Sequence, residues 1–284
     1  MIKNVVKDGR ARKRSVLMWH VSGNNPSSRQ IGSNSNPTRQ RFPQPSSPSS
    51  LNPFFEKMPL FPRVEYEKNN GSKPVMIFLA GYPDNERSGW GTIVPEEMSK
   101  DYDLHFLCLP GYEKGGKVPG WGWNFDELVE FLHLTISQVN KDLPVVLVTH
   151  DWGAFLGLLY QTKYPQNVRK LILFDVGMLD VFTVSLKSMI YITMYQVWLA
   201  LSFIVSRVAG VFAGTIFMAI FFLPIFRPLW PTTDVPPINR NEIRSDKCYT
   251  YFHLWKKLLT TLKVPKVKFP TMPTLYMVIF QFFH

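Results

Sequence analysis

The chain has 284 residues, enough for one large domain with an insertion, and a formal net charge of +11. Its two cysteines, Cys108 and Cys248, lie far apart in the sequence. This spacing argues against a disulfide scaffold or a zinc site and favours a reducing compartment. The histidines are scattered too, so we predict no metal and no cofactor. Because no long apolar core follows the basic start, we expect no secretory signal and an intracellular protein.

The composition of residues 1–62 predicts a disordered tail. It is basic at first, then rich in Ser, Asn, Pro and Gln, and is too polar to bury a core. The basic run 10–14 could direct nuclear import, bind nucleic acid or rest on anionic lipid, but we favour a solvated leader. No aromatic side chains interleave these charges, so we predict no specific nucleic-acid partner.

Residues 63–177 alternate strand and helix patterns, and residues 263–284 return to a strand pattern. Apolar runs predict strands over 63–68, 75–79, 104–109, 145–148, 168–174 and 270–280. Helical spacing follows at 90–98, 124–139 and 155–164, and Asn124 with Glu127 forms a capping box. This alternation predicts an α/β fold with a doubly wound, mostly parallel sheet and its chemistry at the carboxyl ends of the strands.

One stretch, 145–157, combines a buried strand, a tight corner and a packed helix. That combination presents a nucleophile at the tip of a strained turn, and the residue at the tip is Asp151. Gly153 and Gly157 provide the small residues needed where strand and helix backbones nearly touch, while Thr149 stands where a glycine is usual. The alternative is that Asp151 is a structural residue at a turn.

The corner sequence Thr-His-Asp-Trp-Gly (149–153) resembles the α/β-hydrolase fold in its epoxide hydrolase and haloalkane dehalogenase branch, whose nucleophile is a carboxylate. The segment Ala-Gly-Tyr-Pro (80–83) is similar to the His-Gly-x-Pro loop of that family, with Ala80 in place of the histidine. Leu-Pro-Gly-Tyr (109–112) resembles a third family segment. The resemblance covers about 75–177 and, loosely, the remainder of the chain.

The resemblance implies a role for each matched position. Asp151 would attack a strained or halogen-bearing carbon, and the backbone N–H groups of Tyr82 and Trp152 would receive the oxyanion when the resulting ester is hydrolysed. Asp175 could supply the acid of a catalytic pair, or it could be a helix cap or turn residue. Tyr251, and after it Tyr249, could hydrogen-bond the epoxide oxygen, or these tyrosines could simply pack.

The expected general base has no clear position. In the family the acid and the histidine follow the nucleophile, whereas this chain stops at His284 just after a predicted strand. The resemblance therefore implies C-terminal truncation, and turnover is in doubt. We expect an enzyme that opens an apolar epoxide, or a related ester or halide, through an Asp151 ester. The alternative is a non-catalytic membrane-associated relative, or a truncated isoform, that binds an apolar ligand.

Residues 178–262 form a helical cap if the resemblance holds. The runs 188–206 and 208–226 carry no charged side chain, and each is about as long as a bilayer-spanning helix. Lys187, Arg207 and Arg227 mark their edges and could snorkel to headgroups. The cap could be buried against the core, rest on or embed in a membrane, or form a spanning hairpin. We favour membrane association at the cytoplasmic face.

Overall fold

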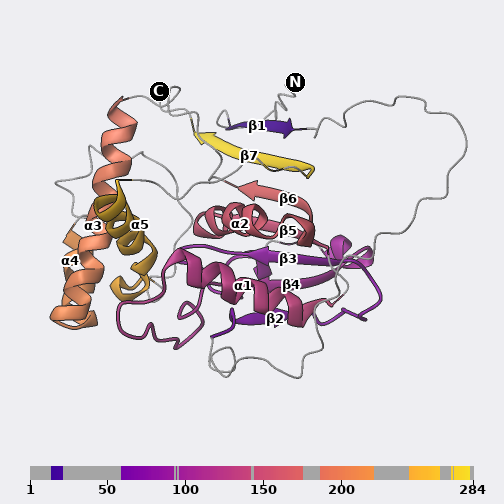
Figure 1. The fold of residues 1–284 in the computed structure, drawn as a ribbon, viewed down its shortest axis with the longest axis horizontal. Coiled ribbons are helices and arrows are strands. Elements are labelled where there is room, and N and C mark those ends of the chain that lie inside the picture. Colours follow the sequence, from indigo (N-terminus) through magenta and orange to yellow (C-terminus); the bar gives the residue numbers. More distant parts are fainter. Residues whose placement is uncertain are drawn as a thin grey trace, which may run out of the picture.

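The computed structural model describes residues 59–92, 94, 96–141, 144–174, 186–220, 243–262, 270 and 272–281, and the strand 14–21 by its backbone. Its strands form one seven-stranded sheet in the order β1-β7-β6-β5-β3-β4-β2 (Figure 1). They are β1 (Arg14–Val21), β2 (Arg63–Glu65), β3 (Val75–Leu79), β4 (Asp103–Leu107), β5 (Val145–His150), β6 (Val168–Phe174) and β7 (Thr274–Gln281).

The sheet is parallel at its centre and antiparallel at both edges. Strands β4, β3, β5, β6 and β7 run parallel, and β2 and β1 close the two edges in the opposite direction. All five residues of β3 and all five of β4 are buried, as continuous apolar runs require when both faces of a sheet are covered. The predicted mostly parallel α/β sheet is confirmed.

Two helices pack against one face of this sheet. They are α1 (Phe125–Val139) and α2 (Trp152–Lys163), and their apolar side chains join Ile77, Leu79 and Leu147 in the larger core cluster. Asn124 caps α1, because its side chain accepts the N–H groups of Asp126 and Glu127. The opposite face buries Met76, Phe78, Leu104, Phe106, Val146 and Val148 in a second cluster.

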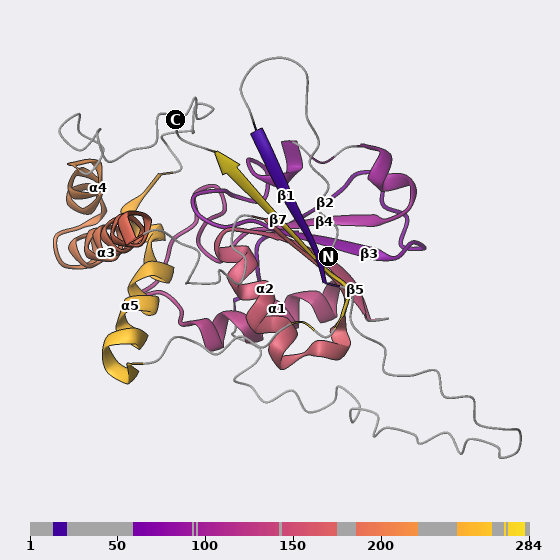
Figure 2. The same ribbon diagram turned by 90° about the horizontal axis from the view of Figure 1, so that it is seen from above.

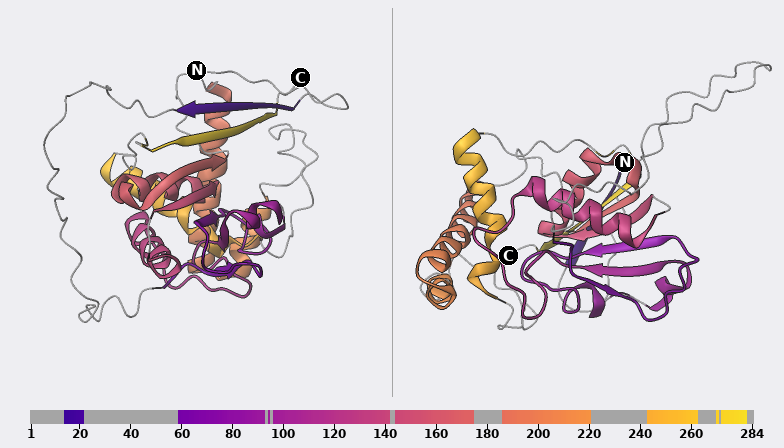
Figure 3. Two further views of the ribbon diagram at one scale, coloured as in Figure 1. Left: turned by 90° about the vertical axis from the view of Figure 1, so that its right-hand side faces the viewer. Right: turned by 60° about the horizontal axis from the view of Figure 1, so that its bottom comes forward.

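Among the described residues between β6 and β7, three helices form what we term the helical insert. They are α3 (Leu186–Val208), α4 (Val211–Ile220) and α5 (Tyr249–Thr261), with the 3-10 turn Ser245–Lys247 before α5. The insert stands beside the carboxyl ends of β6 and β7, with α3 and α4 along its outer edge (Figures 1 and 2). Figure 3 shows α5 running alongside α3, and these two helices are in contact.

Two local expectations differ from the structure. The predicted helix over 90–98 is instead two 3-10 turns, Trp90–Thr92 and Glu96–Lys100, since Pro95 disfavours helical backbone at the residue before it. Within the predicted disordered tail, Arg14–Val21 forms β1 and pairs with β7 along eight residues. Strand β7 is therefore paired on both sides, with β6 and with β1. This pairing joins segments more than 250 residues apart, which local composition does not encode.

Candidate active site

The carboxyl end of β5 turns sharply into α2, and Asp151 is the residue in the turn. Its backbone has φ 51° and ψ −125°, a conformation that L-residues rarely adopt and that costs on the order of 1–3 kcal/mol. The turn is this tight because α2 approaches β3 closely. A Cβ on Gly153 would lie 2.4 Å from the Leu79 carbonyl oxygen, so only glycine fits there. The strained backbone aims the Asp151 side chain away from the sheet, toward the loop after β3.

Two backbone amides meet the Asp151 carboxylate at that loop. The Tyr82 N–H donates to Oδ2 at 2.8 Å, and the Trp152 N–H interacts with the same carboxylate. Gly81 makes this arrangement possible. A Cβ at residue 81 would lie 2.4 Å from the Asp151 Oδ2 and 2.5 Å from the Trp152 nitrogen. The two amides are therefore positioned to stabilise negative charge on oxygens attached to Asp151.

Thr149 occupies the place before the corner where a glycine is usual, and the structure shows how it fits. The side chain is fully buried, and its hydroxyl donates to the Ile172 carbonyl oxygen at 3.2 Å. Opposite it, a Cβ on Gly157 would lie 3.0 Å from the threonine methyl group. The missing side chain at residue 157 thus leaves the space that Thr149 fills.

Burial raises the pKa of the Asp151 carboxyl above its ordinary value, since removal from water disfavours the charged form. Hydrogen bonds from the Trp152 and Tyr82 amides and the charge of His150 act in the opposite direction, whereas Asp84 raises the pKa further. The carboxylate thus combines partial desolvation, which favours nucleophilic attack, with amide donors that keep it available as an anion.

Aromatic side chains surround this carboxylate. The Tyr251 ring, from α5, meets Trp152 edge to face at 4.8 Å between ring centroids and Tyr82 at 6.0 Å. Burial, and after it the negative charge of Asp151, raises the pKa of the Tyr251 phenol well above its usual value. The Tyr251 hydroxyl consequently stays protonated at neutral pH and can act as a hydrogen-bond donor. The indole N–H of Trp152 is buried as well, and its interaction with the Tyr251 hydroxyl lowers the pKa of that phenol against the larger effect of burial.

A second tyrosine of the helical insert, Tyr195 on α3, belongs to the same group, and sequence reasoning missed it. Its ring lies 6.3 Å from the Tyr251 ring. Burial raises the pKa of Tyr195, and the Asp151 charge acts in the same direction. The repeat of Tyr191 and Tyr195 one helical turn apart was the available signal, but an apolar helix with tyrosines at that spacing also suits simple packing.

Comparisons with known proteins agree with this geometry. A family model described as the alpha/beta hydrolase fold matches residues 74–204. A cis-3-alkyl-4-alkyloxetan-2-one decarboxylase of Shewanella oneidensis is 26% identical over 114 residues, 38% of this chain and 34% of that protein. Epoxide hydrolase 1 of Caenorhabditis elegans is 30% identical over 112 residues, 39% of this chain and 27% of that protein. The chain has the α/β-hydrolase fold and, over the matched residues, is similar to an epoxide hydrolase.

The chain is also similar to solved structures. A Bacillus megaterium epoxide hydrolase in complex with an inhibitor has a TM-score of 0.44 and 22% identity, covering 73% of this chain and 72% of that one. The aligned part spans about a third of the length of the curated relatives. The matched region 74–204 includes the corner at Asp151 and the loop that contains Gly81, the two features that build the site described above.

The α/β-hydrolase structure brings together four of the five predicted site residues: Asp151, Tyr82, Trp152 and Tyr251. The fifth, Asp175, lies outside the described residues. Tyr249, named as a second tyrosine, is fully buried, and its hydroxyl donates to the Pro110 carbonyl oxygen at 3.2 Å. Tyr249 packs in the core because it is two positions from Tyr251, and residues two positions apart on a helix face different directions.

Three of the histidines have contacts of their own. His133 stacks on Tyr164 with ring centroids 4.0 Å apart, and His253 lies 3.0 Å from the Trp121 carbonyl oxygen. His105 is buried on β4, where desolvation lowers its pKa. His284, the terminal histidine, is outside the described residues. In the described part of the chain, no group of three His, Cys, Asp or Glu side chains could hold a metal ion.

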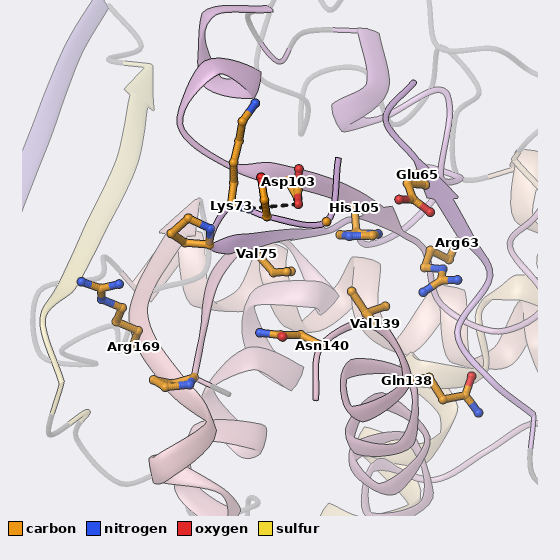
Figure 4. A pocket seen from close by; sticks show the side chains of 14 residues that line it. Arg63, Glu65, Lys73, Val75, Asp103, His105, Gln138, Val139, Asn140 and Arg169 are labelled. Carbon is orange, nitrogen blue, oxygen red and sulfur yellow. Dashed lines mark hydrogen bonds between the residues drawn. The ribbon is translucent and has the colours of Figure 1, made fainter. Parts of the chain in front are cut away.

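A separate hollow opens at the amino-terminal ends of β3 and β5, whereas Asp151 follows the carboxyl end of β5, and Figure 4 shows the side chains that line the hollow. Arg63, Glu65, Asp103 and His105 line it together with the loop before β3. The Asp103 carboxylate already accepts backbone N–H groups at residues 70 and 73. These bonds hold the loop against β4, so Asp103 has a structural role in this hollow.

Proposed function

We propose that the chain opens an apolar, strained oxygen ring, an epoxide first of all, through a covalent ester on Asp151. The observation that carries this proposal is the placement of the Asp151 carboxylate at a strained corner, 2.8 Å from the Tyr82 amide and beneath the aromatic rings of the helical insert. The names of two relatives support the substrate class. One acts on an oxetan-2-one and the other on an epoxide, which are both strained oxygen heterocycles.

In the first step a carboxylate oxygen of Asp151 attacks a ring carbon, so that a carbon–oxygen ester bond forms and the ring carbon–oxygen bond breaks. The released alkoxide takes a proton from a tyrosine hydroxyl, Tyr251 or Tyr195, and the tyrosinate regains it from solvent. A raised tyrosine pKa keeps this proton in place until the alkoxide, a much stronger base, develops. The role of the helical insert as a cap belongs to this step, since it supplies both tyrosines.

In the second step water attacks the ester carbonyl, and the oxyanion forms on the former carboxylate of Asp151. The amides of Tyr82 and Trp152 receive that charge, and collapse of the intermediate releases a diol and restores the carboxylate. Asp175 stays a proposed acid for this step. The contacts of His105, His133 and His253 do not assign them as the base, so we propose that ester formation is fast and its hydrolysis slow.

The test is to incubate the full chain with styrene oxide and record the intact protein mass. We expect a single adduct that maps to Asp151 and is absent in Asp151→Ala. Tyr251→Phe and Tyr195→Phe should each slow adduct formation by about 10²-fold or more, as expected for loss of an acid. Tyr249→Phe is the matched control and should leave the rate unchanged. An adduct that persists in Asp151→Ala would refute the nucleophile.

The second candidate is a non-catalytic α/β-hydrolase relative that binds an apolar ligand. The engagement of His133 and His253 in other contacts favours it. It predicts no adduct with styrene oxide and an affinity for the corresponding diol that is unchanged in Asp151→Asn. The covalent proposal instead predicts adduct formation in the native chain.

A further inference from the structure

The helical insert exposes apolar side chains in a pattern unusual for a surface helix. On α3 six large apolar residues are exposed, and all but Met189 lie along one side: Leu186, Ile190, Met194, Leu201 and Val208. Successive steps of four or seven residues keep these positions within one narrow stripe along the whole helix. Phe212, Ile216 and Ile220 repeat the four-residue step on α4, and Phe212 is 80% exposed. We name these eight residues the outer stripe. A water-facing helix would carry polar side chains at such positions.

The opposite side of α3 is fixed to the protein. Leu199, Ala200 and Phe203 are buried in the main core cluster, and the Phe203 ring packs on Phe252 of α5. Ser202 and Ser206 on the same side are buried as well, and their hydroxyls donate to backbone carbonyls of α3 itself. The helix is therefore two-sided, with one apolar face inside the fold and the other toward solvent.

Arg207 does not behave as a headgroup anchor, which corrects the expectation from the sequence. Its guanidinium donates to the carbonyl oxygens of Val118 at 3.0 Å and Asp246 at 3.3 Å, and it lies over the Phe203 ring. The side chain thus points into the protein and ties the end of α3 to the loop before α1.

These contacts discriminate between the alternatives for the helical insert. By length and composition, the part of α3 from Met189 to Val208 could cross a bilayer. A crossing would require α3 to leave the core and Arg207 to lose both carbonyl acceptors. Helix α4 has ten residues, about half of what a crossing needs. A helix that rests on the bilayer surface keeps every observed contact and buries only the outer stripe.

The charges of the helical insert complement an anionic surface. Its described residues, 186–220 and 243–262, contain six cations, Lys187, Arg207, Arg244, Lys247, Lys256 and Lys257, against one acid, Asp246. Three of the six, Arg207, Lys247 and Arg244, are engaged inside the fold, the last in an ion pair with the buried Asp246, so any charge that faces a bilayer comes from the remaining three lysines. An apolar stripe on a segment with no exposed acid in its described part matches a bilayer that contains anionic lipid.

We propose that the outer stripe of α3 and α4 docks the protein on the surface of an anionic membrane, with α3 lying in the plane of the interface. The occupant of this surface is a lipid bilayer rather than a second copy of the chain. The proposal goes beyond the chemistry proposed for Asp151, because it rests on other residues and holds whether or not the carboxylate reacts.

The experiment is flotation of the full chain with vesicles of phosphatidylcholine, alone or with roughly 30% phosphatidylserine. We expect flotation that increases with phosphatidylserine and falls about tenfold or more in Phe212→Ser, since a large apolar side chain no longer leaves water. Leu201→Ser and Leu60→Ser form a matched pair, because both leucines are 41% exposed and only Leu201 is in the outer stripe. Flotation should fall in the first variant and stay unchanged in the second.

Three results would overturn the proposal. They are absence of the native chain from floated vesicles, an equal loss in Leu60→Ser and Leu201→Ser, and a dimer without lipid that Phe212→Ser abolishes. Extraction with alkaline carbonate separates docking from crossing, because a docked protein is released and a spanning one is retained. Asp151→Ala should float like the native chain, so failure of the proposed chemistry leaves this outcome intact.

Discussion

The central sheet and the helical insert are both built from apolar runs, yet they use them in opposite ways. In β3 every residue from Val75 to Leu79 is buried, because α1 and α2 cover one face of the sheet and side chains such as Trp90 pack on the other. In α3 one apolar face enters the core while Ile190, Leu201 and Val208 remain exposed. Apolar sequence therefore does not imply burial within the chain. In α3 it implies burial of one face only, and we propose an anionic bilayer as the partner of the other face.

The contrast between buried and exposed apolar side chains can be tested by truncating one phenylalanine on the inner side of the insert and one on its outer side. Phe203→Ala removes a fully buried ring that contacts Trp121 and Phe252, and should lower the free energy of unfolding by about 3–5 kcal/mol. Phe212→Ala removes an exposed ring and should change it by less than about 0.5 kcal/mol. Thermal or urea unfolding measures both. Equal losses would show that the outer stripe is part of the core.

On the sheet side, Gly81→Ala is expected to give the next largest effect. The new Cβ would lie 2.4 Å from the Asp151 Oδ2 and 2.5 Å from the Trp152 nitrogen, closer than van der Waals contact allows. The amides and the carboxylate therefore cannot keep their positions. We expect adduct formation with styrene oxide to fall by about 10²–10³-fold, the usual cost of a lost oxyanion donor.

Gly91→Ala is the control for Gly81→Ala. A Cβ at residue 91 meets only the Glu86 carbonyl oxygen, at 3.4 Å, which is ordinary contact. Its adduct rate should equal that of the native chain. If Gly81→Ala reacted at the native rate as well, the amide pair would have no part in the chemistry.

These contrasts show what the sequence could and could not predict. Buried strands and the corner at Asp151 follow from unbroken apolar runs and from glycines at fixed spacing, so local pattern is sufficient. The pairing of β1 with β7 and the approach of Tyr195 to Tyr251 depend on segments distant in the chain. No local hydrophobic periodicity in the sequence encodes these long-range contacts. The direction of Arg207 was missed for the same reason, since its acceptors, Val118 and Asp246, come from other parts of the chain.

Asn124→Ala tests a feature that local sequence did predict. The Asn124 side chain accepts two N–H groups at the start of α1, and the Glu127 carboxylate accepts the Asn124 N–H at 2.8 Å. Loss of this capping box should lower the free energy of unfolding by about 1 kcal/mol. Gln138→Ala, at an exposed position near the other end of the same helix, should change it by less than about 0.5 kcal/mol. Chemical unfolding of both variants measures the difference.

The smallest expected effect concerns Asp151 itself, where burial and hydrogen bonding oppose each other. Burial raises the pKa of the folded-state carboxyl, although the amides of Tyr82 and Trp152 offset part of that increase. The folded protein therefore binds the Asp151 proton more tightly than the unfolded chain does. The resulting stability is fully present below the unfolded-state pKa and is lost as the pH rises through the folded-state value.

Asp151→Asn removes that dependence while keeping an oxygen that can accept the Tyr82 N–H. The variant should consequently have a slightly higher midpoint of thermal unfolding than the native chain at neutral pH, and the gain should disappear in acid. The adduct rate of the native chain should fall over the same acidic range, because only the ionised carboxylate attacks. A thermal series and a rate series across pH measure the two changes. If the rate fell at a pH where the stability difference did not change, a group other than Asp151 would control the reaction.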